Sequence, residues 1–142
     1  MLTEKDYCDY ETCVALKELG YKVPTSAYYM PKNSQLIFVI NQFRGGAAMD
    51  CFYSNNSLPK ECMASDFIDA PTMWEAQKWL REEKKLFVEI TIEAFDQTYI
   101  WEIYRTENSI LIAFGDSSHN TYEEALSEGI KEAVKILKEE RK

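Results

Sequence analysis

The segment of residues 116–120 reads Asp-Ser-Ser-His-Asn and holds the one histidine of the chain, beside an acid and two hydroxyls. In a Ser-His-Asp triad the histidine takes the serine proton while the acid orients the ring, so the three groups must converge across the fold. Neighbours in one loop seldom converge in this way, and the sequence has no Gly-x-Ser-x-Gly nucleophile elbow. The pattern therefore favours a loop that leads into a helix capped by Thr121, and no catalytic residue is predicted.

Three acids close together in the sequence, Glu61, Asp66 and Asp69, are candidates for an acid–base pair or for Mg²⁺ ligands. A working carboxylate pair needs a set separation and perturbed pKa values, and sequence spacing indicates neither. Aspartate strongly favours loops and helix N-caps. We therefore interpret these acids as part of a solvated loop in which Asp69 can cap a helix.

The four cysteines are spaced without any Cys-x-x-Cys pair, at Cys8, Cys13, Cys51 and Cys62. Structural zinc sites usually place two ligands about two to four residues apart, which this spacing does not match. We expect free thiols, as in a reducing compartment. No metal and no cofactor is predicted.

A glycine pair after a cation, Arg44-Gly45-Gly46, is suited to a backbone nest that binds phosphate or carboxylate. The segment matches neither a P-loop nor the Gly-x-Gly-x-x-Gly fingerprint. A sharp turn at the end of a strand explains the same residues, so anion binding and a turn remain alternatives. Together with Tyr53 and Tyr104, these three residues are the predicted contacts for a ligand or a partner.

Aromatic residues make up 13% of the chain and give the stronger indication of a binding surface. In the strands predicted in the second half of the chain, one set of side chains alternates with the set assigned to the core: Phe87, Ile100, Tyr104 and Leu111. A second large apolar face of a sheet is either a surface for a partner or a second copy, or it is covered by residues 44–70.

The net charge of the chain excludes some classes of binding partner. The net charge of −8 repels nucleic acid and anionic membranes and attracts basic partners. The length of 142 residues fits one domain. No apolar run approaches the ~20 residues of a membrane helix, and the first residues lack the apolar region of a signal peptide. We expect a cytoplasmic protein that binds neither nucleic acid nor membranes.

Helical spacing and capping signals predict three helices, near residues 4–19, 72–84 and from residue 121 onward. Thr3-Asp6, Thr72-Glu75 and Thr121-Glu124 are the corresponding capping pairs. Strand patterns lie near residues 27–30, 36–43, 88–92, 99–104 and 110–114. Within the strand predicted at 36–43, residues 36–40 are apolar without alternation, so we expect a central strand there.

The order of these elements is α-β-β-(loop)-α-β-β-β-α, with a long irregular segment at about residues 44–70. Short turns favour antiparallel neighbours, and helices must bury their apolar faces on a sheet. The sequence therefore predicts a single α+β domain over residues 1–142. We expect two layers, with three helices on a mainly antiparallel sheet of about five strands.

Residues 70–82 read Ala-Pro-Thr-Met-Trp-Glu-Ala-Gln-Lys-Trp-Leu-Arg-Glu, and residues 121–133 open with Thr-Tyr-Glu-Glu-Ala-Leu. Both stretches resemble small, functionally uncharacterised bacterial and phage-borne proteins, for which no defined family can be named. The resemblance implies an accessory role in a bacterium or mobile element, and it implies no activity.

Three functions stay open at this level. The first hypothesis is a non-catalytic protein-interaction or accessory protein that binds a protein partner or a second copy of itself. The alternative is a small-molecule or anion-binding module, or a weak enzyme, with a pocket near residues 44–70. A third interpretation is an acidic surface that imitates nucleic acid and occupies the basic cleft of a nuclease.

Overall fold

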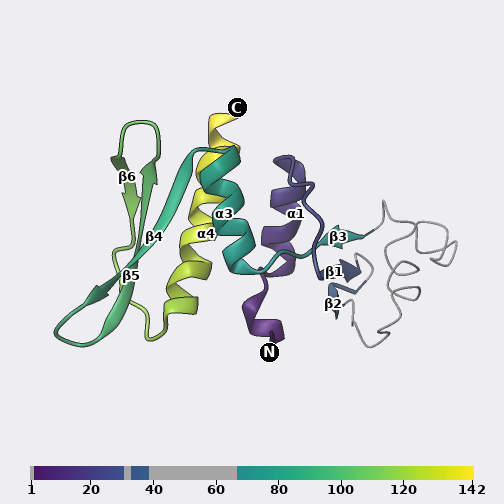
Figure 1. Cartoon of the computed structure of the whole chain (residues 1–142), viewed down its shortest axis with the longest axis horizontal. Helices are drawn as coiled ribbons and strands as arrows, with labels where there is room; N and C mark the ends of the chain where they lie inside the picture. Colours follow the sequence, from purple (N-terminus) through teal and green to yellow (C-terminus); the bar gives the residue numbers. More distant parts are fainter. Residues whose placement is uncertain (1, 31–32, 39–66) are drawn as a thin grey trace, which may run out of the picture. The chain divides into compact units, whose positions relative to one another are not determined.

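The structure is a computed structural model that describes residues 2–30, 33–38 and 67–142 (Figure 1). Contacts divide the chain into two compact units, one formed by Met1–Cys8 with Thr72–Lys142 and the other by Asp9–Pro71. The single domain expected from the sequence therefore stays a prediction.

The helix predicted over residues 4–19 is broken into two pieces. A 3-10 turn, Glu4–Asp6, is closed by the Asp6 carboxylate, which accepts a hydrogen bond of 2.7 Å from the Thr3 N–H. The helix α1 begins only at Tyr10 and runs as Tyr10–Glu18. Asp9 causes the second start, because it has extended backbone and its carboxylate accepts a 2.8 Å hydrogen bond from the Thr12 N–H.

Glycine ends α1 as its sequence position predicts. Gly20 has a φ of 102°, the left-handed conformation that a helix end favours. Its N–H donates to the Lys17 carbonyl at 3.0 Å, and the Tyr21 N–H donates to the Leu16 carbonyl at 2.9 Å. This pair of bonds is the Schellman motif, so the stop signal at residue 20 is confirmed.

The unit Asp9–Pro71 holds a small antiparallel sheet in the order β2-β1-β3. Its strands are β1 (Ala27–Met30), β2 (Gln35–Phe38) and β3 (Ile68–Asp69). The predicted hairpin is confirmed, with Tyr28 opposite Ile37. Among the described residues β1 lies between β2 and β3. The central position expected for the 36–43 strand stays a prediction, because residues 39–43 lie outside the described residues.

The second unit carries the remaining elements. They are α3 (Met73–Glu83), β4 (Leu86–Glu93), β5 (Thr98–Arg105), β6 (Ile110–Phe114) and α4 (Tyr122–Glu140). Thr72 and Glu75 form the predicted capping box, through bonds of 2.8 and 3.2 Å. At α4 the Thr121 hydroxyl accepts from the Glu124 N–H at 3.1 Å. These starts confirm the two later helices.

The strands β4, β5 and β6 form an antiparallel sheet in that order, joined by the short turns that the sequence predicts. The helices α3 and α4 pack side by side and against this sheet (Figure 1). The core between helices and sheet consists of side chains that are essentially inaccessible, among them Leu80, Leu86, Val88, Ile103, Leu126 and Ile130. In this unit the two helices form one layer and the three-stranded sheet the other.

The described chain is α+β with three α-helices and two three-stranded antiparallel sheets, instead of one sheet of about five strands. One difference from the prediction lies at β1, where β3 takes the edge opposite to β2, with Tyr28 opposite Asp69 and Tyr29 opposite Ile68. The sequence pattern assigns residues 68–69 to the irregular segment.

None of the helices in the described ranges combines the length and the apolar character that crossing a membrane requires.

Candidate functional site on the outer face of the second sheet

The face of the β4–β5–β6 sheet that points away from the helices carries both aromatic and acidic side chains. Cross-strand register pairs Phe87 with Tyr104, Glu89 with Glu102, and Tyr104 with Leu111. Directly opposed residues of an antiparallel pair share one face. The residues between them, such as Val88 and Ile103, are fully buried on the opposite face. We call the set Phe87, Glu89, Glu102, Tyr104 and Leu111, with Phe114, the outer face.

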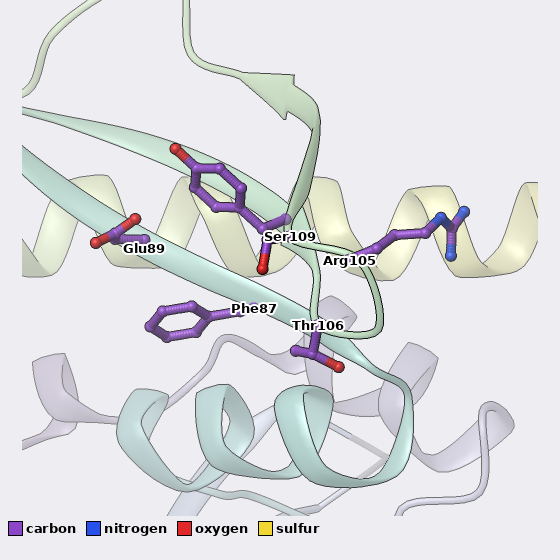
Figure 2. A pocket seen from close by; sticks show the side chains of 6 residues that line it. Phe87, Glu89, Arg105, Thr106 and Ser109 are labelled. Atoms are coloured by element: carbon purple, nitrogen blue, oxygen red, sulfur yellow. The ribbon is translucent and has the colours of Figure 1, made fainter.

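The outer face is hollowed at the end where β5 turns into β6. The hollow has a volume of about 360 Å³ and is lined by Phe87, Glu89, Tyr104, Arg105, Thr106 and Ser109. Figure 2 looks onto it, with Phe87 and Glu89 projecting from β4 and α4 lying behind the strands. This volume is near the lower end of the range for small ligand sites, so the hollow can accept one side chain or a small molecule.

Tyr104 is hydrogen-bonded to one of the acids of this face. Its hydroxyl donates a 3.1 Å hydrogen bond to Oε2 of Glu102, two residues earlier on the same strand. This bond to the carboxylate is the main cause that raises the pKa of Tyr104 above its ordinary value; desolvation and the negative charges of Glu102 and Glu89 act in the same direction. The negative charges of Glu89 and Glu102 are therefore both felt at the Tyr104 hydroxyl.

The basic groups nearest to the hollow already have partners. Arg105 forms an ion pair with Glu140 of α4. The Arg81 guanidinium of α3 lies 5.9 Å from the centre of the Phe87 ring, within the range of a cation–π contact. No lysine or arginine in the described parts of the chain forms an ion pair with Glu89 or Glu102.

Exposed apolar side chains continue the outer face along the edge strand β6. Leu111 is 41% exposed and Phe114 is 64% exposed. Register places Phe114 opposite Glu102, and hence on the outer face with Leu111. The surface is therefore a mixture of apolar groups and carboxylates that form no ion pair with a described lysine or arginine.

Replacing Glu102 by glutamine is expected to lower the pKa of Tyr104 towards its ordinary value, because the charged acceptor is removed. A pKa raised by folding favours the neutral phenol. Its contribution to stability is therefore present below the unfolded pKa and is lost as the pH rises through the folded pKa. Ring-¹³C tyrosine NMR, titrated into the alkaline range, measures the change, with Tyr104→Phe for assignment. Glu93→Gln, on the exposed end of β4, is the control and should leave the Tyr104 titration unchanged.

One of the five predicted contact residues lies at this site, namely Tyr104. The other four, Arg44, Gly45, Gly46 and Tyr53, lie outside the described residues, as do Glu61, Asp66, Cys51 and Cys62. The opposed pair Glu89–Glu102 was not predicted. Its signal was present, because a turn centred near residues 95–96 sets the register of the two alternating strands.

Within residues 116–120, the backbone of His119 pairs with the backbone of Tyr99. The His119 N–H donates to the Tyr99 carbonyl and the Tyr99 N–H donates to the His119 carbonyl, each at 2.8 Å. This bridge precedes the helix cap at Thr121. The observed pairing supports the interpretation of a loop that leads into α4.

The described cysteines and acids show no metal site. Cys8 and Cys13 are buried free thiols. Within the described ranges no three His, Cys, Asp or Glu side chains are grouped so that they could hold a metal ion. Asp69 lies in β3 and does not cap a helix; desolvation raises the pKa of its carboxyl, and the charge of Lys17 opposes that rise.

Comparison with known proteins gives no relative: no family model, no curated protein and no solved structure matches the chain.

Proposed function

We propose that this chain is a non-catalytic protein-interaction protein of accessory type, and that the outer face of the β4–β5–β6 sheet is its contact surface. The observation that supports this proposal is the run of large apolar side chains on that face, from Phe87 and Tyr104 to Leu111 and Phe114. Apolar groups enriched in aromatics are typical of the centre of a protein interface.

The charges of the face favour a basic protein segment as its occupant. Glu89 and Glu102 stand among the apolar groups, and the whole chain has a net charge of −8. Opposite charge accelerates encounter and selects partners, whereas a nucleic acid would be repelled. The partner that fits this face is a protein segment in which a basic side chain is flanked by apolar ones.

The test is an affinity capture from a nuclease-treated lysate of the host organism, read by mass spectrometry, with three matched baits. A protein enriched by the wild-type chain should be lost with Leu111→Glu, because the substitution places another carboxylate on the outer face. It should be retained with Ile92→Glu, since Ile92 is 64% exposed and pairs with Tyr99 on the opposite face.

A protein retained by all three baits would show that binding uses another surface. A strictly monomeric wild-type bait that retains no protein would contradict the interaction function itself. Both substitutions are at side chains that are largely accessible, so the variants are expected to fold.

The second candidate function is a small-molecule-binding module or weak enzyme, and the hollow of about 360 Å³ is the observation that favours it. A thermal-shift screen with metabolites tests this function, because a ligand at a hundred times its Kd stabilises the folded state by about 2.7 kcal/mol. A set of metabolites that produces no stabilisation would count against it. The anion nest at Arg44–Gly46 stays a prediction of the sequence.

A further inference from the structure

We propose that the hollow on the outer face binds the guanidinium group of an arginine side chain from the partner, between the aromatic pair Phe87–Tyr104 and the acid pair Glu89–Glu102. This assignment rests on the proposed interaction function and adds the chemical group that the surface recognises. It follows from three observations on the described residues: an opposed acid pair, an opposed aromatic pair beside it, and a hollow lined by Phe87, Tyr104 and Glu89. Glu102 does not line the hollow itself, but its carboxylate accepts the hydrogen bond of the Tyr104 hydroxyl.

The acid pair is the first observation. Glu89 and Glu102 are direct cross-strand partners, so their Cα atoms are about 4.5–5.5 Å apart and both carboxylates lie on the outer face. Like charges directly opposed in a sheet are destabilising. Both side chains are half-buried, and no described lysine or arginine pairs with either. A cation that bridges them removes this repulsion.

The aromatic pair is the second observation. Phe87 and Tyr104 are the next partners along the same strands and lie on the same face as the acids. The face of an aromatic ring attracts cations, and a guanidinium can stack on it. The Arg81 guanidinium lies 5.9 Å from the centre of the Phe87 ring, and Arg81 itself is not among the residues that line the hollow.

The chemistry of the hollow favours a guanidinium over other cations. Guanidinium is planar, has five N–H donors and is less strongly hydrated than an ammonium group, so it can stack on a ring and donate to carboxylates at the same time. A hard metal ion prefers a shell of oxygen ligands, and the aromatic wall offers none. Arg105 lines the hollow, but its charge is compensated by Glu140.

The experiment uses the full chain, ¹⁵N-labelled, titrated with Nα-acetyl-arginine amide and followed by two-dimensional NMR. The expected result is a saturable shift of the amides of Phe87, Glu89, Glu102 and Tyr104, with a Kd in the millimolar range that fits one isolated contact. The citrulline analogue has the same shape without the charge and is expected to bind at least about tenfold more weakly. The lysine analogue is also expected to bind more weakly.

Two variants and a control test the role of the acid pair. Glu89→Gln and Glu102→Gln are each expected to weaken arginine-amide binding about tenfold, since each removes one charged acceptor. Neither should unfold the chain, because each removes like-charge repulsion. Glu93→Gln takes the same charge from the exposed end of the same strand and should leave the Kd within about twofold.

Several results would overturn the arginine site. These are equal binding of the citrulline or lysine analogue, shifts confined to residues outside the hollow, no saturable shift, or a Kd unaffected by both acid variants. The lysate capture distinguishes failure of the arginine site from failure of the interaction function. A partner that is lost with Leu111→Glu but retained with Glu89→Gln leaves the outer face as the contact surface and removes the arginine site.

Discussion

Replacing Ile103 by alanine is expected to lower the free energy of unfolding of the unit that contains residues 72–142 by about 2–5 kcal/mol. Ile103 is 0% exposed and lies in the middle strand, opposite Val88 on β4 and Ala113 on β6. The helix α4 packs against β5. Because strands on both sides hold the backbone of β5 in place, the surroundings can collapse only partly into the space left by the branched side chain.

Tryptophan fluorescence during urea unfolding measures this change. All three tryptophans, Trp74, Trp79 and Trp101, belong to the unit of residues 72–142, so the signal reports on that unit. The matched control is Ile92→Ala, which removes the same atoms at a position that is 64% exposed and should cost less than about 0.5 kcal/mol. A loss of less than about 1 kcal/mol for Ile103→Ala would contradict the packing described for this sheet.

The Gly129→Ala variant should be less stable than the wild type by up to about 2 kcal/mol, although alanine is the better helix former. Helix propensity alone favours alanine over glycine by about 1 kcal/mol. A Cβ atom at residue 129 would lie 2.6 Å from Cγ1 of Val88 and 3.0 Å from Cβ of Trp101. Val88 is fully buried and β-branched, so its side chain cannot easily turn away. Overpacking of this kind typically costs about 1–3 kcal/mol.

The double variant Gly129→Ala with Val88→Ala separates the close contact from other effects. Removal of the Val88 methyl groups makes room for the new Cβ, so the two substitutions should cost less together than the sum of their separate costs. Urea unfolding of the four chains gives the coupling energy. Stabilisation by Gly129→Ala alone, at the level of helix propensity, would show that α4 is not pressed against β4 at this residue.

The local signals of the sequence predicted the elements of residues 72–142 closely. The capping pair Thr72–Glu75, the alternation in the strands and the helical spacing after Thr121 each act within a few residues, and the structure confirms all three. The same holds for the stop at Gly20, where a left-handed residue is required. Local steric and hydrogen-bonding preferences suffice for such features.

Two predictions of local structure failed, one because a second helix cap competed with the helical spacing and one because the strand was too short to give a pattern. The apolar spacing through residues 4–19 indicated one helix, but Asp9 offers its carboxylate as a new cap and Tyr7 pairs instead with Thr72. The strand β3 was missed, because two residues are too few for a periodic pattern. Its pairing with β1 depends on contacts far apart in the chain.

The secondary structure of residues 72–142, the aromatic side chains on both faces of its sheet and the negative net charge could all be predicted from the sequence. Tertiary structure alone decided that Glu89 stands opposite Glu102 and Phe87 opposite Tyr104, and that a hollow opens beside them. It also decided that the described strands form two sheets. The two kinds of feature differ in the sequence distance over which their interactions act. Caps and periodicity depend on a few neighbouring residues, whereas opposed side chains and sheet edges arise only when distant segments pair.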